Sequence, residues 1–473
     1  MTVAFPVQKE IPKSSLMSMA STTPGDASRT KHKHRLILLL GALVLAFCAY
    51  LVRERLERVV VATSVYRAHI FTPPQPLPGE SPWVRLREHA KFYWDFSGFI
   101  VAREARLKKF DPELKPLVRE IDRRQAAGEG MQYSMHVYRE VRWRLNFTPD
   151  ETATQARIDD LRASLLRPDL QKLAAEQQRS DGSWALGINV WYLTLYYSVE
   201  DGLDNGAVSK YPLSFLDRIN SPEKMTAQLD SDLYDDLPKT GEFNREELDE
   251  TFSALARLLF KMKPTGYAFD PGLPGALTAF VARWQNPVTG CWGQWFVDRQ
   301  GRIWKMDDMG MTFHVVSDLK GNVPRLDLVA KRLLQLDGVN FPAGILFDGN
   351  YENHLNWDAV KISRYAWPYL DDATRAQAQA EISRMLDWCL TKSLQPDGSF
   401  KVSDLDDTVG DAYDYGVYFL RETGYFRRDD RFWTDQDFPD SKAVHDRIET
   451  KIKSIGLNDA GLKQAYDTLE PVN

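Results

Sequence analysis

Three short stretches of this chain share one arrangement: QRSDGSW at 178–184, QNPVTGCW at 285–292 and QPDGSF at 395–400. In each, a glutamine precedes a glycine by three to five residues, and an aromatic residue lies two residues after the glycine. The glycines Gly182, Gly290 and Gly398 follow one another at equal steps of 108 residues. Weaker copies at Gly241 and Gly344 fall between them and halve the step. Because a repeat of about 50 residues is one helical hairpin with its connections, the spacing predicts an array of helix pairs.

The residue types in these stretches suit the end of a helix. Glycine adopts the left-handed backbone conformation that closes a helix, which other residues adopt only with strain. The glutamine can bond backbone groups left unpaired there, and the aromatic ring can pack back on the helix ends. All of this is structural work, and none of it requires catalysis.

The three stretches resemble the Gln-Trp repeats of the terpenoid cyclase and protein prenyltransferase superfamily. In that superfamily helical hairpins form an α/α toroid, and the repeats are structural clamps. The resemblance implies an all-α fold, an α/α toroid of helical hairpins. Hydropathy adds one transmembrane helix before it, as described below.

Hydrophobic periodicity supports a helical domain. Strand-like alternation is confined to residues 294–305, where a short hairpin would turn at 298–301. The predicted helices cover 83–109, 113–128, 131–147, 151–166, 169–178, 189–203, 245–262, 273–284, 309–319, 325–336, 357–369, 373–394, 407–422 and 442–455.

Hydropathy divides the chain into four parts. Residues 1–35 are rich in Ser, Thr, Pro and Lys and are expected to be a disordered cytoplasmic tail. The uncharged stretch 36–52 has the length of a short membrane helix, and a cleaved signal peptide is the alternative. Residues 53–82 are a juxtamembrane segment with a Pro-rich spacer, and 83–473 is the toroid domain. The slight excess of lysine before the membrane segment places the large domain outside, as in a single-pass membrane protein.

Charge and cysteine content exclude several classes of protein. The net charge is −6 and no basic block follows residue 35, so nucleic acid is not an expected partner. Three cysteines without a Cys/His cluster predict neither a disulfide framework nor zinc. We expect no cofactor; the expected partners are the lipid bilayer and a small-molecule or glycan substrate.

A carboxylate cluster follows the third glycine turn in the sequence DLDDTV at 404–409. It resembles the Asp-x-Asp-Asp-Thr motif of class II terpenoid cyclases, in which the middle aspartate protonates an alkene or epoxide. The resemblance implies Asp406 as the acid, with Asp404 and Asp407 as its orienting partners. Two features depart from the family: Val409 replaces the usual alanine, and the chain has room for one helical barrel rather than two. Capping of the next helix by these aspartates is the competing interpretation.

Further polar residues follow other glycine turns of the repeat at a similar distance along the chain. If equivalent hairpin ends converge on one mouth, these residues would meet there, although each could also be an ordinary helix cap. His314 lies six residues after Asp308, and His354 is followed by Asp358, which gives candidate acid/base pairs. The candidate catalytic residues are Asp406, Asp404, Asp407, His314 and His354, and the candidate substrate-binding residues are Asp307, Asp308, Asn356, Trp357, Asp411, Tyr413 and Tyr415.

Three functions are compatible with these patterns. The first is an anchored toroid enzyme that acts on an isoprenoid or another apolar substrate by acid catalysis. The second is an extracytoplasmic glycan hydrolase or lyase, since sugar clefts combine aromatic walls with carboxylate and histidine catalysts. The third is a membrane-tethered helical scaffold without catalysis. An apolar closed cavity, a polar and aromatic cleft, and no cavity would distinguish the three.

Overall fold

The computed structural model describes residues 53–203, 206–262, 266–403, 408–457 and 460–469. The predicted tail and membrane segment, residues 1–52, lie outside them, as do Asp404, Asp406 and Asp407. Within the described ranges, no helix is both long enough and apolar enough to cross a membrane.

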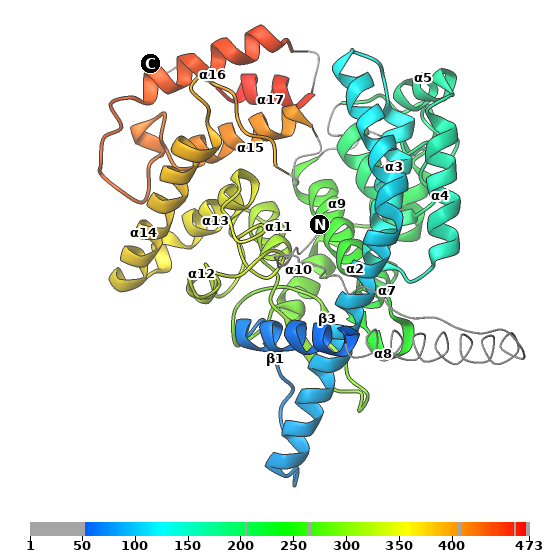
Figure 1. Cartoon of the computed structure of the whole chain (residues 1–473), viewed down its shortest axis with the longest axis vertical. Coiled ribbons are helices and arrows are strands. Elements are labelled where there is room, and N and C mark those ends of the chain that lie inside the picture. The colour runs from blue at the N-terminus through cyan, green and yellow to red at the C-terminus, as the bar shows by residue number, and fades with distance from the viewer. Residues whose placement is uncertain (1–52, 204–205, 263–265, 404–407, 458–459, 470–473) are drawn as a thin grey trace, which may run out of the picture.

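The described chain is largely helical, as predicted, with a small sheet (Figure 1). The α-helices are α2 (Pro82–Ala126), α3 (Gln132–Phe147), α4 (Glu151–Ser164), α5 (Pro168–Glu176), α6 (Trp191–Tyr197), α7 (Pro222–Leu233), α8 (Leu237–Thr240), α9 (Arg245–Ala256), α10 (Leu273–Trp284), α11 (Met309–Asp318), α12 (Leu326–Gln335), α13 (Asn353–Ala366), α14 (Asp372–Trp388), α15 (Val409–Glu422), α16 (Ser441–Ile455) and α17 (Ala460–Thr468). Residues 53–68 are also helical and precede the first strand. Helices α6, α9 and α14 run on into short π-helical segments, Ser198–Leu203, Arg257–Lys261 and Cys389–Ser393.

The sheet has four short strands in the order β1-β4-β3-β2: β1 (Phe71–Thr72), β2 (Tyr234–Asp235), β3 (Trp295–Val297) and β4 (Ile303–Met306). Strands β3 and β4 are antiparallel, with Phe296 opposite Trp304, and Asp298 accepts the backbone hydrogen bond of Gly301 in their turn. The predicted hairpin is therefore confirmed. Strand β1 is antiparallel to β4, and the buried Phe71 ring contacts Phe96 of α2. Part of the segment predicted to be a spacer is thus built into the sheet.

Helix α2 replaces the two helices predicted at 83–109 and 113–128, so the predicted break at 110–112 is wrong. Pro112 and Pro116 both lie inside it. Each proline removes one backbone donor, but buried residues on both sides, Phe110 and Ile121, hold the helix against α3 and α4. Packing against α3 and α4 therefore outweighs the helix-breaking tendency of the two prolines.

Helices α6, α9, α11, α13 and α15, called the inner helices below, pack one against the next, and further helices pack against this row (Figure 1). Helix α7 packs on α9, α12 on α13, and α17 on α15. A turn with a repeat glycine precedes each helix of the inner row: Gly182 before α6, Gly241 before α9, Gly290 before α11, Gly344 before α13 and Gly398 before α15. The repeat therefore marks where the chain passes from an outer helix to an inner one.

The predicted left-handed conformation is confirmed at the three strong glycines, whose φ angles are +85° at Gly182, +78° at Gly290 and +88° at Gly398. Two of the glutamines also act as predicted. The Nε2 atom of Gln178 donates to the carbonyl of Gly182 at 2.7 Å, and that of Gln285 donates to the carbonyl of Gly290 at 2.8 Å. The turns are structural clamps.

Candidate functional site

The inner helices carry polar or aromatic side chains at one level, near the sixth residue of each. Helices that rise by about 1.5 Å per residue from a common end bring such positions to the same height. Three of these residues act electrostatically on one another: the charge of His314 affects the pKa of both Glu250 and Asp358. The set is Tyr196 of α6, Glu250 of α9, His314 of α11, Asp358 of α13 and Tyr415 of α15.

His314 forms the centre of the site with Asp249. Its Nδ1 atom lies 2.8 Å from Oδ1 of Asp249, and the two side chains are 27% and 5% exposed. Burial lowers the pKa of His314, but the charge and hydrogen bond of Asp249, with Glu250 and Asp318 adding to them, raise it to about 10. Burial works to raise the pKa of Asp249, and His314 and Arg245 hold it below its ordinary value. The pair is an imidazolium beside a carboxylate at neutral pH.

Arg245 and Asp308 support this pair from the start of the helices. The Arg245 guanidinium donates to both carboxylate oxygens of Asp308, at 2.6 and 2.9 Å, and lies 3.8 Å from Asp249. Asp308 also caps α11 by accepting the backbone hydrogen bond of Met311. Asp308 therefore reaches the site through Arg245 and positions it.

Burial favours the neutral form of two carboxyl groups of the site. Burial raises the pKa of Asp358 well above its ordinary value, and the charges of His314 and Lys361 offset this only in part. Burial also raises the pKa of Glu250, with the charge of Asp249 adding to it. Asp358 Oδ1 and Glu250 Oε2 are buried and have no hydrogen-bond partner among the described residues. Each is a carboxylic acid with a free oxygen atom, beside a cation.

Aromatic rings form one wall of the site. His354 stacks on Tyr415 with ring centroids 3.9 Å apart and planes 5° from parallel, and its Nε2 lies 4.0 Å from Asp358 Oδ2. Trp357 stacks on Tyr418 at 5.1 Å, and its buried Nε1 has no hydrogen-bond partner within the part of the chain that the structure describes. The structure thus brings His354, Trp357 and Tyr415 together.

Other predicted site residues lie elsewhere. Asp307 accepts hydrogen bonds from Asn286, Thr289 and Arg332, which link the second glycine turn to α12. Asp411 forms a capping box with Thr408 at the start of α15.

Asn356 and Tyr413 lie on the opposite faces of their helices. Each is two residues from a site residue, His354 or Tyr415, which corresponds to a rotation of about 200°. Asn356 is fully buried, and Tyr413 packs on Phe400. The predicted catalytic aspartates at 404, 406 and 407 lie outside the described residues.

Sequence reasoning did not select Arg245, Asp249 or Glu250. Their signal is the run REELDE at 245–250, in which Arg245 and Asp249 are one helical turn apart. Such a run is typical of a solvated helix face, so only the packing of α9 between α6 and α11 reveals its role.

One group of side chains in the described residues could hold a metal ion, His445, Asp446 and Glu449 on α16. Lys442 pairs with Asp446, and Lys453 pairs with Glu449, so both carboxylates are already neutralised. This group is also separate from the inner helices, and we assign it no metal.

Comparison of the chain with models of protein families, with curated proteins and with solved structures found no match. The chemistry of the site itself therefore has to carry any functional conclusion.

Proposed function

We propose that this protein cleaves a glycosidic bond in a glycan by acid/base catalysis. The observation that supports this most directly is Asp358. Its carboxyl group has a buried, unbonded oxygen and lies beside the His314 cation and an aromatic wall, and burial raises its pKa, which favours the neutral acid. A neutral carboxylic acid next to ring faces is what protonation of a glycosidic oxygen requires.

The nature of the side chains favours a polar substrate over an isoprenoid. His314 acts electrostatically on both Glu250 and Asp358, so the three polar groups belong to one site. Unbonded polar atoms there can bond sugar hydroxyls, while Trp357 and Tyr415 offer flat faces for sugar rings. An apolar chain would leave those polar atoms unpaired, which costs about 1–3 kcal/mol for each. The isoprenoid hypothesis depends on Asp406, outside the described residues, and stays a prediction.

In the proposed mechanism Asp358 donates its proton to the glycosidic oxygen as the bond to the leaving sugar breaks. Glu250 is the second carboxyl group. After releasing its proton to solvent it acts as the base, taking a proton from the attacking water as the water oxygen bonds to the anomeric carbon. Transfer of that proton through solvent from Glu250 to Asp358 then restores the acid. The His314 cation favours the ionised form of both groups, so it compensates whichever of them is a carboxylate. Asp249 keeps His314 protonated throughout.

We also propose that the row from α6 to α15 closes into an α/α toroid, with the α2–α5 region completing the ring. The five glycine turns, at steps of 59, 49, 54 and 54 residues, and the successive packing of the inner helices support this. The apolar run at 36–52 supports a single membrane anchor with the domain outside. Experimental coordinates in which the helix row is open would refute the toroid.

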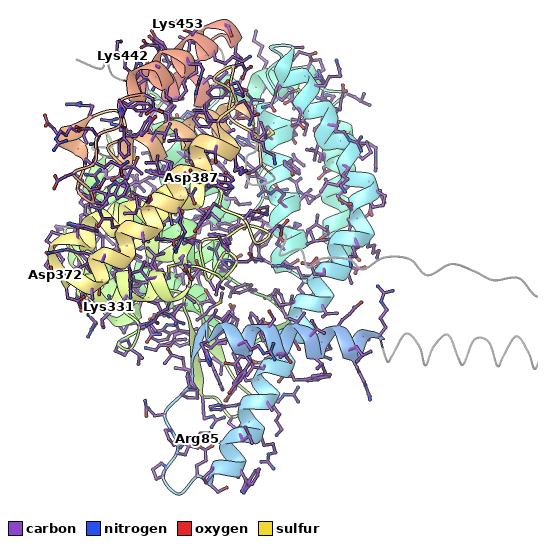
Figure 2. The ribbon with its side chains drawn as sticks, turned by 60° about the vertical axis from the view of Figure 1, so that its left-hand side comes forward. Arg85, Lys331, Asp372, Asp387, Lys442 and Lys453 are labelled. Carbon is purple, nitrogen blue, oxygen red and sulfur yellow. The ribbon has the colours of Figure 1, made fainter. Side chains whose placement is uncertain are left out.

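The experiment uses the full chain in detergent micelles with a panel of neutral, uronate-containing and amino-sugar oligosaccharides. New reducing ends are expected with at least one of them, and a product that absorbs ultraviolet light as an unsaturated uronate would identify a lyase rather than a hydrolase. Asp358→Asn should abolish the reaction and leave the melting temperature unchanged, because it keeps the shape of the neutral acid. Asp372→Asn is the control, since Asp372 is fully exposed at the periphery of the molecule (Figure 2).

No new ends across the whole panel would refute the proposal. Equal turnover by wild type and Asp358→Asn would remove Asp358 from the mechanism.

A further inference from the structure

Lys361 lies on the same face of α13 as Asp358, one helical turn further along. Three residues along a helix correspond to about 4.5 Å, which is less than the length of one sugar unit. The Lys361 ammonium lies 4.8 Å from the ring centre of Trp357 and 5.9 Å from that of Phe313. The residue is therefore next to the proposed cleavage point and against its aromatic wall.

No carboxylate neutralises this ammonium among the described residues, although three act on it from nearby. Glu422 is paired with Arg364. Asp318 is paired with Lys261 at 2.5 Å and accepts a hydrogen bond from Ser253 at 3.0 Å.

The third carboxyl group, Asp358, is buried, and burial raises its pKa and so favours its neutral form. Burial also lowers the pKa of Lys361, as expected for an ammonium that lacks a close counter-ion. Positive charge is thus left over at this point of the site.

We propose that Lys361 binds an anionic group of the substrate, so that the glycan carries a carboxylate on the sugar next to the cleaved bond. This inference rests on the proposed function, because it names the substrate class of the same site. A carboxylate that lies against Lys361 forms the ion pair that the protein does not supply. The partly buried surroundings make such a pair stronger than one at the surface. Neutral glycans would leave the ammonium unpaired.

The test measures binding as well as turnover. The probes are three tetrasaccharides, built on galacturonate, on mannuronate and on glucuronate, each compared with its methyl ester. Binding is measured by calorimetry to the full chain carrying Asp358→Asn, so that the ligand stays intact. At least one free acid should bind about tenfold or more tightly than its ester. Adding Lys361→Met should remove that preference and leave ester binding unchanged.

Lys331→Met is the matched control, because Lys331 lies on the outer helix α12 and pairs with Asp371 (Figure 2). It should keep the full preference for the acid. Turnover by the chain with Asp358 intact gives the second measurement: Lys361→Met should raise KM for the acid about tenfold relative to KM for the ester, whereas Lys331→Met should not change this ratio.

The outcomes separate the two proposals. If acid and ester bind equally, or if Lys361→Met leaves the preference intact, the anionic subsite is wrong, whatever the turnover. If the acid is preferred through Lys361 but no probe is cleaved, the subsite stands and bond cleavage is wrong.

Discussion

Replacing Asp249 with asparagine tests the charge pair on which the site is built. The pKa of His314 is raised from 6.5 to about 10. At about 1.4 kcal/mol per pKa unit, this corresponds to roughly 5 kcal/mol of interaction as an upper bound. In Asp249→Asn the pKa of His314 should fall by several units, because burial is then opposed only by more distant charges. Loss of one partner of a buried pair costs about 3–5 kcal/mol.

The sign of the pH dependence follows from the direction of the shift. A histidine whose folded pKa exceeds its unfolded value stabilises the protein fully below the unfolded value, here 6.5. That stabilisation is lost as the pH rises from 6.5 towards 10. The melting temperature of Asp249→Asn should therefore lie well below that of the wild type at pH 6, and the difference should shrink by pH 9.5.

The assay combines thermal unfolding with an NMR titration of the histidine ring protons, assigned by comparison with His314→Gln. Wild-type His314 should not titrate between pH 5.5 and 8.5, and in Asp249→Asn it should. Asp372→Asn is the exposed control and should behave as the wild type. A wild-type His314 that titrates near 6.5, or a stability difference that is the same at both pH values, would contradict the reasoning.

Three further outcomes are expected. Gly398→Val should lower the free energy of unfolding by more than about 1 kcal/mol, because φ is +88° and an added Cβ would lie 2.4 Å from the Arg447 carbonyl oxygen. Gly349→Val is the control, and thermal unfolding should show a smaller loss for it, because φ there is +76° but nothing lies within 4 Å of an added Cβ. Tyr415→Leu should lower glycan turnover by removing the ring that stacks on His354, whereas Tyr413→Leu should lower only the melting temperature. Burial and the charges of Asp232 and Glu242 raise the pKa of Glu247 from 4.5 to about 8, so the folded protein loses stability as the pH rises between these values. The melting temperature of Glu247→Gln should therefore be higher than that of the wild type at pH 8.5 and equal to it at pH 4.5.

The helical repeat could be predicted because its signal is local. A glycine that must adopt positive φ, and a glutamine that bonds the same turn, leave their mark within a few residues. Helix ends were harder, because α2 continues through Pro112 and Pro116 where local rules predict a break. Contacts with α3 and α4 decide that point, and they are distant in sequence.

The site was predictable to the extent that its residues follow the turns. His314, His354, Trp357 and Tyr415 were selected this way, and the structure places them around Asp358. Proximity in sequence could not separate the two faces of one helix, so Asn356 and Tyr413 were grouped with residues that face the other way.

Asp249 and Glu250 were missed for a different reason. Their charged run has the composition of an exposed helix surface, and only the packing of α9 against α6 and α11 buries that surface.

Strand β1 ties the start of the domain to the element that bears His314. Phe71 pairs with Met306, the Ile70 carbonyl accepts the Asp307 hydrogen bond, and Arg332 contacts the His69 carbonyl. Asp308, the cap of α11, is the next residue along the chain. Tension on the predicted anchor would therefore act as shear on the two-residue pairing of β1 with β4, and would not be taken up by a flexible linker. The turn that leads into α11 would then be the first part of the helical domain to receive such a pull.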